Sequence, residues 1–515
     1  MVAGNATTLL ISLVALGAIA WGYVRGRAYG KLGILAWLQS VLLMAPWLLF
    51  FALFSFGIYL NFVAVLLLFV LATAAYIYVG RQMRTLGQNE LIRQRLERLL
   101  ENSATEQAAQ NEDKTGAPAQ ASNTSSAQTA IAELNPIPAE DLAAIQEIFG
   151  IDTFFSTETI PYQEGAIFKG NLRGEPVETL KRLEARLEQR LGDRYRLYLI
   201  NGPEDRPVVI ALPTQNEPKP ASTGQWLLAA VLFIATFVTC LERGGLQSNF
   251  DIFAQPERWT ETLPIGLSLM AILVVHEAGH WLMARRHDVR LGPSFLLPAW
   301  QLGSFGGLTR IESVLPNRSV LFDIAFAGPA AGGVLSLLFL LLGLGLSSQP
   351  GPLAGSLAIP AEILQGSMLV GTLARTILGD TLQAATIQIH PFVVVGWLGL
   401  VITALNLVPA GQLDGGRMVQ AVYGRKLAGR STLISLVGLA IFSLANPVAL
   451  YWSVLVLFLQ RQPERPSQNE LTEPDDARAA LCLLALFLTL TVLLPLSPAL
   501  AGRLGIGLET SPLLF

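Results

Sequence analysis

The sequence of 515 residues predicts a polytopic α-helical membrane protein of about eight or nine membrane segments, with a small α+β soluble domain inserted between two groups of them. Apolar residues make up 52% of the chain and charged residues only 14%, whereas soluble domains carry about 25% charged residues. Apolar runs long enough to cross roughly 30 Å of hydrocarbon recur along the chain. They lie at about 7–24, 32–56, 57–79, 225–241, 263–284, 321–347, 391–408, 431–460 and 478–498.

The first three runs predict an N-terminal membrane region over 1–80. No basic stretch precedes the first run, so we interpret it as a retained span and not as a signal peptide. Residues 81–130 then change character. Arginines interleave with Leu and Ile at helical spacing up to residue 102, which indicates a helix that is solvated or lies on the membrane surface. The Ala-, Gln- and Ser-rich remainder predicts a flexible linker.

Residues 131–220 predict the soluble α+β domain. PAEDLAAIQEIFG and ETLKRLEARLEQRLG have helical patterns, and Gly192 ends the second. YRLYLI and PVVIALP have strand patterns on either side of a Gly-Pro turn. A second membrane region follows over 221–465, and 466–515 is expected to form a loop and a C-terminal span. The run at 431–460 is too long for one straight span, so we expect either one kinked span or a short re-entrant pair.

Charge and cysteine content restrict the function classes. The net charge of −3 offers no general basic surface, so we expect no nucleic-acid partner. Only Cys240 and Cys482 are present, which excludes a disulfide framework or a cysteine-based metal site. Clusters of Lys and Arg follow the first, third, fifth and seventh runs. They place 131–220 on the cytoplasmic side if the spans alternate.

The sharpest chemical signal is His276-Glu277-Ala-Gly-His280 within an apolar run. Residues i and i+4 share one face of a helix, so two imidazoles can hold one Zn²⁺ while the adjacent Glu277 acts as a base. A pair of core histidines is the alternative. It is weakened here because polar side chains are costly inside a bilayer and are usually functional.

A catalytic zinc needs a third protein ligand. His287 lies two turns beyond His280 at the basic membrane edge, and His390 opens the 391–408 run. Asp414 in ITALNLVPAGQLDGGRMV is the better candidate, because an acidic residue beside two glycines at a helix break can approach a metal closely. An ordinary helix-terminal aspartate is the alternative. If Asp414 is a ligand, His390 lies about a membrane thickness away and cannot be one.

Together, HEAGH and Asn406-Leu-Val-Pro-Ala-Gly-Gln-Leu-Asp414-Gly resemble the site-2 protease family of intramembrane zinc metalloproteases. The resemblance covers about 220–460. It implies that His276, His280 and Asp414 bind zinc, that Glu277 is the base, and that Asn406 positions the scissile carbonyl or its oxyanion. Arg417 stands where a His often follows the Gly-Gly pair, but this is not a ligand position.

Three further stretches fit this resemblance. LPAWQLGSFGGLTRIES resembles the family's Gly-rich β-segment, which implies that Gly303, Gly306 and Gly307 bind an unwound substrate; a mere connecting hairpin is the alternative. AFAGPAAGG resembles the family's AGP-containing helix, and its small residues favour close helix packing. Gly170-Asn-Leu-Arg-Gly174 resembles the motif of the EGY-type proteases of chloroplasts and cyanobacteria (ethylene-dependent gravitropism-deficient and yellow-green), although alone it is a turn with an arginine.

The sequence therefore predicts a multi-pass intramembrane zinc endopeptidase with transmembrane proteins as substrates and the lipid bilayer as its surroundings. The resemblance implies a cyanobacterial-type plasma or thylakoid membrane. A catalytically silent zinc-binding scaffold or chaperone is the first alternative, and the intact Glu277 argues against it. A transporter with a buried metal is the second, but no repeated half-chain is visible.

Overall fold

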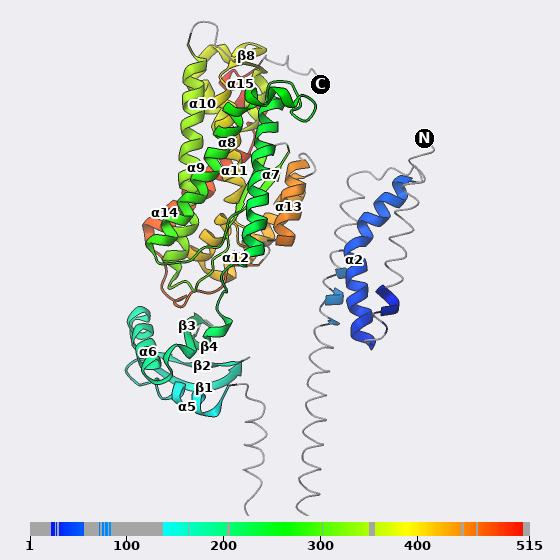
Figure 1. The fold of residues 1–515 in the computed structure, drawn as a ribbon. Coiled ribbons are helices and arrows are strands. Elements are labelled where there is room, and N and C mark those ends of the chain that lie inside the picture. Colours follow the sequence, from blue (N-terminus) through cyan, green and yellow to red (C-terminus); the bar gives the residue numbers. More distant parts are fainter. Residues whose placement is uncertain are drawn as a thin grey trace, which may run out of the picture. The chain divides into compact units, whose positions relative to one another are not determined.

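The computed structural model describes two units, Met1–Leu134 and Asn135–Phe515, which are treated separately (Figure 1). In the first unit it describes helix α2 (Gly30–Ser55), within the second apolar run, and a few residues on either side. The runs at 7–24 and 57–79 and the stretch 81–130 lie largely or wholly outside the described residues. The described residues are 22–25, 27, 30–55, 72, 75–76, 78–80, 82–83 and 137–507, except 163, 203–205, 301, 350–355, 444–446 and 460–461.

Residues 137–216, here the sheet domain, form a four-stranded antiparallel sheet of order β1-β2-β4-β3. Its elements are α5 (Ala139–Gln146), β1 (Phe154–Tyr162), β2 (Gly165–Leu172), α6 (Pro176–Leu191), β3 (Tyr195–Asn201) and β4 (Pro207–Pro213). The buried leucines of α6 pack on the apolar face of the sheet, and the helix ends at Gly192, whose φ is +57°. The two helices, β3 and β4 match the sequence prediction, whereas the β1–β2 hairpin was not predicted.

The GNLRG motif lies at the end of β2. Gly170 pairs with Ser156 of β1, and a Cβ on Gly170 would lie 2.1 Å from the carbonyl oxygen of Phe155. A side chain cannot fit there, so this glycine has a structural reason to be present.

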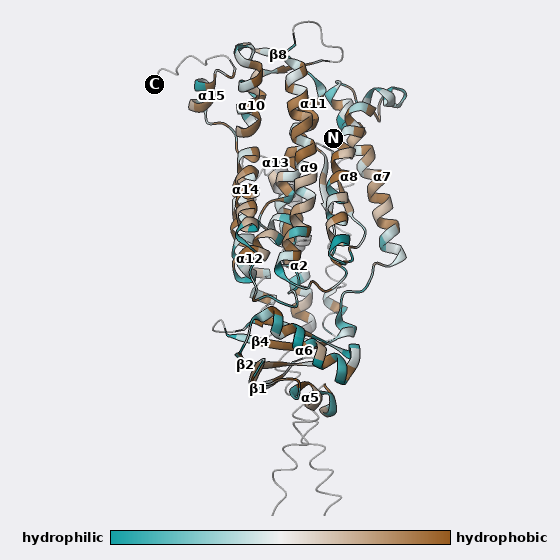
Figure 2. Cartoon of the chain, turned by 90° about the vertical axis from the view of Figure 1, so that its left-hand side faces the viewer, coloured by the Kyte–Doolittle hydropathy of each residue, from teal (hydrophilic) through white to brown (hydrophobic). Residues whose placement is uncertain are grey.

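Apolar helices form the body of the second unit, here the helical body (Figure 2). Among the described residues, four helices are long and apolar enough to cross a membrane: α7 (Thr223–Gln247), α8 (Trp259–Arg286, with the preceding turn from Pro256), α9 (Arg318–Ser347) and α14 (Asp476–Leu493). Helix α9 is central and packs against α8, α11 (Pro391–Asn406) and α12 (Asp414–Phe442). The chain is therefore an integral membrane protein, while the total of eight or nine segments stays a prediction.

The long apolar run at 431–460 is divided between two helices. Helix α12 continues to Phe442, with a kink at Gly424, and α13 (Pro447–Leu459) follows and packs against it. The run at 391–408 forms α11, which ends at Asn406 and is followed by turns before α12. A stretch with no predicted elements, 356–390, contains β7 (Leu357–Pro360), α10 (Met368–Leu378) and β8 (Thr386–Ile389), and α15 (Pro498–Leu504) follows α14.

A hairpin of β5 (Phe295–Ala299) and β6 (Gly303–Leu308) lies between α8 and α9, in the stretch that resembles the family's Gly-rich β-segment. Strand β5 is the one strand partner of β6 among the described residues. The pairing shifts register between Leu296 and Pro298.

Residues 462–471, here the strap, join the sheet domain to the helical body. Leu199 on the edge strand β3 donates its N–H to the Gln468 carbonyl (2.7 Å) and accepts the Glu470 N–H (2.9 Å). On its other side the strap donates from Gln468 to the carbonyl of Leu315, just before α9. The sheet domain thus lies at the end of the body where α8 finishes in Arg285 and Arg286.

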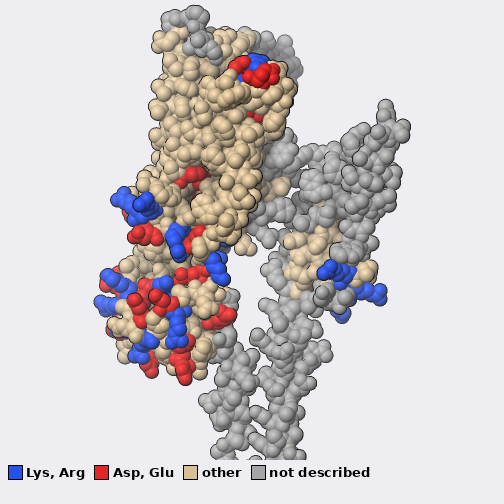
Figure 3. All heavy atoms as spheres, in the orientation of Figure 1, with Lys and Arg blue, Asp and Glu red and all other residues tan. Residues whose placement is uncertain are grey.

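Charged side chains cluster on the sheet domain and on the adjoining end of the helical body, and few lie on the flank that Figure 3 shows. Asp323, at this end of α9, pairs with Arg478 of α14 (2.7 Å) and with His287 (3.2 Å). A flank with few charges beside a charged end is the distribution that a bilayer requires.

Candidate metal centre

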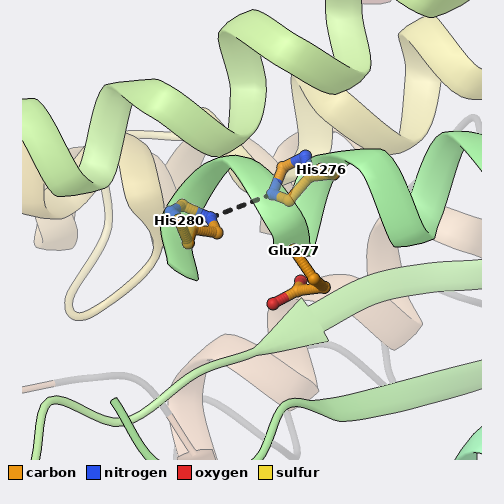
Figure 4. Close-up of side chains that lie close together, drawn as sticks. All are labelled: His276, Glu277 and His280. Carbon is orange, nitrogen blue, oxygen red and sulfur yellow. Dashed lines mark hydrogen bonds between the residues drawn. The ribbon is translucent and has the colours of Figure 1, made fainter. Parts of the chain in front are cut away.

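Two buried histidines face the interior of the helical body from α8. His276 and His280 are one helical turn apart, with 5% and 4% of their surfaces exposed, and their Nε2 atoms lie 3.1 Å from each other. Figure 4 shows the two imidazoles approaching each other, while Glu277 leaves the helix toward a neighbouring strand.

Asp414 completes the group from the first position of α12. Its Oδ2 lies 3.3 Å from Nε2 of His276 and 3.4 Å from Nε2 of His280, and the residue is 6% exposed. Two atoms bound to one tetrahedral zinc at 2.0–2.2 Å lie about 3.3–3.5 Å apart. The two nitrogens and one oxygen thus form a triangle of nearly the size that a zinc ion requires.

The hydrogen bond behind His280 is compatible with a cation at this point. Nδ1 of His280 lies 2.7 Å from the carbonyl oxygen of Ile324. A carbonyl only accepts, so Nδ1 carries the hydrogen, and Nε2 of the neutral ring presents a lone pair. Either a bound cation or a proton on Nε2 must therefore lie between that atom and the carboxylate oxygen of Asp414. An imidazole oriented by a carbonyl behind it is also the usual arrangement around bound metal ions.

Glycines on α9 allow this close approach. A Cβ at Gly328 would lie 2.2 Å from Nε2 of His280, and one at Gly332 would lie 2.9 Å from Cβ of His276. The prediction that the small residues of AFAGPAAGG serve close helix packing is therefore confirmed. These residues leave space for the two imidazole rings of α8 against α9.

The Gly-Gly pair after Asp414 has a similar reason. A Cβ at Gly415 would lie 1.9 Å from the carbonyl oxygen of Leu407, and one at Gly416 would lie 2.3 Å from that of Gly411. The first turn of α12 thus packs directly on the turn that follows α11, and this contact directs Asp414 toward α8.

Glu277 lies beside the triangle and not within it. Its carboxylate comes within 4.8 Å of the ligand atoms of both histidines, so distance alone would also allow it to bind a metal. Asp414 lies closer to the two imidazoles than this limit and is more buried than Glu277. One oxygen of Glu277 accepts a hydrogen bond from the Thr309 hydroxyl (2.7 Å). A carboxylate held next to the ligands in this way can act as a base.

Strand β6 contacts Glu277 and Asn406. A Cβ on Gly307 would lie 2.2 Å from the Glu277 carboxylate, and one on Gly306 would lie 2.1 Å from Nδ2 of Asn406. Gly303 is at the far end of β6, where its carbonyl accepts from the Thr239 hydroxyl (2.6 Å). Of the three glycines, two therefore border the candidate site.

Asn406, which is 2% exposed, uses both hydrogens of its amide on main-chain carbonyls. Nδ2 donates to Phe305 of β6 (3.2 Å) and to Ile402 of its own helix (2.9 Å). The side chain thus ties β6 to the end of α11.

The other two histidines are elsewhere. His287 caps the C-terminus of α8 and pairs with Asp323, and Nδ1 of His390 accepts the Phe392 N–H at the start of α11. Thr309, which contacts Glu277, and Arg417 and Glu464, which are joined to Thr309 by hydrogen bonds, were not predicted as site residues. For Arg417, the sequence signal was its position directly after Asp414-Gly-Gly. Nothing in the sequence indicated Thr309 or Glu464.

Residues 265–445 match peptidase family M50, and residues 143–219 match the EGY3 middle domain. The chain is 39% identical over 374 residues to probable zinc metalloprotease EGY2 of Arabidopsis thaliana, which covers 71% of this chain and 67% of that protein. It is 36% identical over 407 residues to probable zinc metalloprotease EGY1 of the same plant, covering 73% and 74%. Identity to the EGY3 protein of this plant is 30% over 381 residues. No solved structure matches the chain.

His276, Glu277 and His280 could hold a metal ion, and the relatives are named zinc metalloproteases. This membrane protein is therefore a zinc metalloprotease. The chain belongs to peptidase family M50, the site-2 protease family, and within it to the EGY branch.

Proposed function

We propose that this protein is an intramembrane zinc endopeptidase that hydrolyses peptide bonds within or next to the transmembrane segments of other membrane proteins. The observation that carries the proposal is the convergence of His276, His280 and Asp414 at one buried point, with Glu277 beside it. In this proposal the first three residues hold Zn²⁺.

Bound Zn²⁺ supplies a Lewis acid that acidifies water and polarises a carbonyl oxygen. Glu277 then takes a proton from the attacking water and later gives a proton to the leaving nitrogen of the cut peptide bond. A purely structural zinc site needs no such base, so the carboxylate that Thr309 holds beside the ligands favours catalysis over a silent scaffold.

The depth of the site supports a substrate within the membrane. His276 and His280 lie ten and six residues before Arg286, the basic end of α8. At 1.5 Å per residue this is about 9–15 Å along the helix. We infer that the cut lies inside the bilayer, on the side that the basic clusters assign to the cytoplasm.

Strand β6 is the element that we propose for binding the substrate. An intact substrate helix keeps its peptide bonds inside its own hydrogen-bond ladder, so it must unwind locally before it is cut. An unwound segment can add to the edge of a strand, and Gly306 and Gly307 lack side chains there. Asn406 can hold the scissile carbonyl only if it releases one of its present acceptors, and the Phe305 carbonyl on β6 is the one next to that edge.

For localisation, we propose a cyanobacterial-type plasma or thylakoid membrane. The support is the similarity to relatives that are named as chloroplastic.

The substrate class can be tested by mapping cut sites. Membranes from a strain without the protein are incubated with purified protein in liposomes, and new peptide termini are identified by mass spectrometry. We expect the new termini to lie within or beside apolar segments of about 20 residues. The Glu277→Gln protein sets the background. New termini that lie only in soluble domains, or that arise there as fast as in membrane segments, would contradict an intramembrane substrate.

A further inference from the structure

Arg417 forms a buried contact that zinc binding does not require. It lies one turn after Asp414 on α12 and is 6% exposed. Its Nε donates to Glu464 of the strap (3.0 Å), and its Nη2 donates to the carbonyl oxygen of Thr309 (2.8 Å). One guanidinium therefore joins three segments that are distant in the sequence: the start of α12, the residue after β6, and the strap.

Glu464 is buried, and its main chain is fixed by two hydrogen bonds. The residue is also 6% exposed, and its carbonyl oxygen accepts from Gln420 (3.1 Å) and from Arg425. Burying an arginine–glutamate pair costs desolvation that the attraction between the charges often only balances. Stability alone is thus a weak reason for this pair. The planar guanidinium of arginine can instead donate to two acceptors at once, here the Glu464 carboxylate and the Thr309 carbonyl.

Thr309 connects Arg417 to the proposed base, Glu277. The Glu277 carboxylate can only accept, so the Thr309 hydroxyl donates to it (2.7 Å), and Ser294 Oγ lies 3.2 Å from the same hydroxyl oxygen. Arg417 fixes the main chain of Thr309, and the Thr309 side chain fixes Glu277.

We propose that Thr309 and Arg417 are positioning residues for Glu277, and that Glu464 keeps Arg417 in place. The series Glu464–Arg417–Thr309 holds the carboxylate within reach of the metal ligands. It also links the site to the strap, whose next residues pair with the edge strand β3 of the sheet domain. This inference rests on the proposed role of Glu277 as the base.

The test compares Thr309→Val with Thr309→Ser in the purified full-length protein. Valine keeps the shape and removes the hydroxyl, and serine keeps the hydroxyl. Displacing a catalytic group by about 1 Å can cost about 100-fold in rate, and loss of a partner behind a site residue typically costs 10–100-fold. We expect Thr309→Val to lower kcat by about 10–100-fold, with KM, zinc content and thermal unfolding as in the wild type. Thr309→Ser should keep the wild-type kcat.

Thr489→Val is the matched control, since that buried hydroxyl donates only to a carbonyl of its own helix α14. Wild-type kcat in Thr309→Val would overturn the inference. So would equal losses in the valine and serine variants, because the hydroxyl that serine keeps would then not be what maintains the rate.

A second variant tests the arginine. Arg417→Gln combined with Glu464→Gln removes both charges together and so avoids leaving one of them buried without a partner. We expect kcat to fall as in Thr309→Val while zinc stays bound, and an unchanged kcat would overturn the role of Arg417. Glu277→Gln is measured alongside. If it stays active, the proposed function fails; if it is inactive while Thr309→Val is fully active, only this inference fails.

Discussion

Replacing Glu277 with Gln should leave zinc binding intact and remove nearly all cleavage. Glutamine keeps the shape of the side chain and can still accept from the Thr309 hydroxyl, but it cannot take a proton from water. The general-base contribution alone is typically worth about 10²–10⁴-fold in rate. Metal analysis, thermal unfolding and a cleavage assay on the same preparation test this expectation.

The same variant distinguishes an enzyme from a scaffold. An intact substrate should accumulate in membranes that contain Glu277→Gln. If this variant cleaves at nearly the wild-type rate, hydrolysis with Glu277 as the base is wrong for this protein.

Asp414→Ala should release the metal. The two histidines would lose the carboxylate that lies closest to both of them, whereas catalytic zinc sites use three ligands from the protein. Changing a group that merely supports a ligand costs about 10–100-fold in metal affinity or activity, so loss of a ligand should cost at least about 100-fold. We expect zinc content well below one ion per chain and no measurable cleavage.

His287→Ala is the control for this prediction. That imidazole lies at the end of the same helix as the ligands but pairs with Asp323 outside the triangle, so its loss should leave zinc content unchanged. Full zinc and full activity in Asp414→Ala would show that the third ligand is another residue.

Features that depend on local spacing could be predicted from the sequence. His276 and His280 share a face because a helix has 3.6 residues per turn, and this holds wherever the helix lies. Helix α6 carries leucines at helical spacing and ends at a glycine. The glycines beside Asp414 indicated a close approach, although they did not reveal that the approach is to the turn after α11.

Features that depend on distant pairing could not be predicted. Strand β1 contains Ser, Thr and Glu in place of an apolar alternation, and it is a strand because it pairs with β2. Thr309 and Arg417 are 108 positions apart, and Arg417 and Glu464 are 47 apart. No periodicity links such residues, so their contact became visible only in the folded chain.

The assignment of Asn406 shows a different limit. The resemblance implies contact with the substrate carbonyl, whereas its amide here donates to Phe305 and Ile402. A motif identifies the residue but not the hydrogen bonds that it must exchange when a substrate binds.

The most direct test of the account is a zinc titration of the purified wild-type protein with a cleavable membrane substrate. The metal is removed with a chelator, zinc is returned in known amounts, and cleavage is measured at each step. We predict no cleavage without zinc and a linear rise that ends at about one bound zinc per chain. Full cleavage by the metal-free protein, or stoichiometric zinc without any peptide-bond cleavage, would contradict the account.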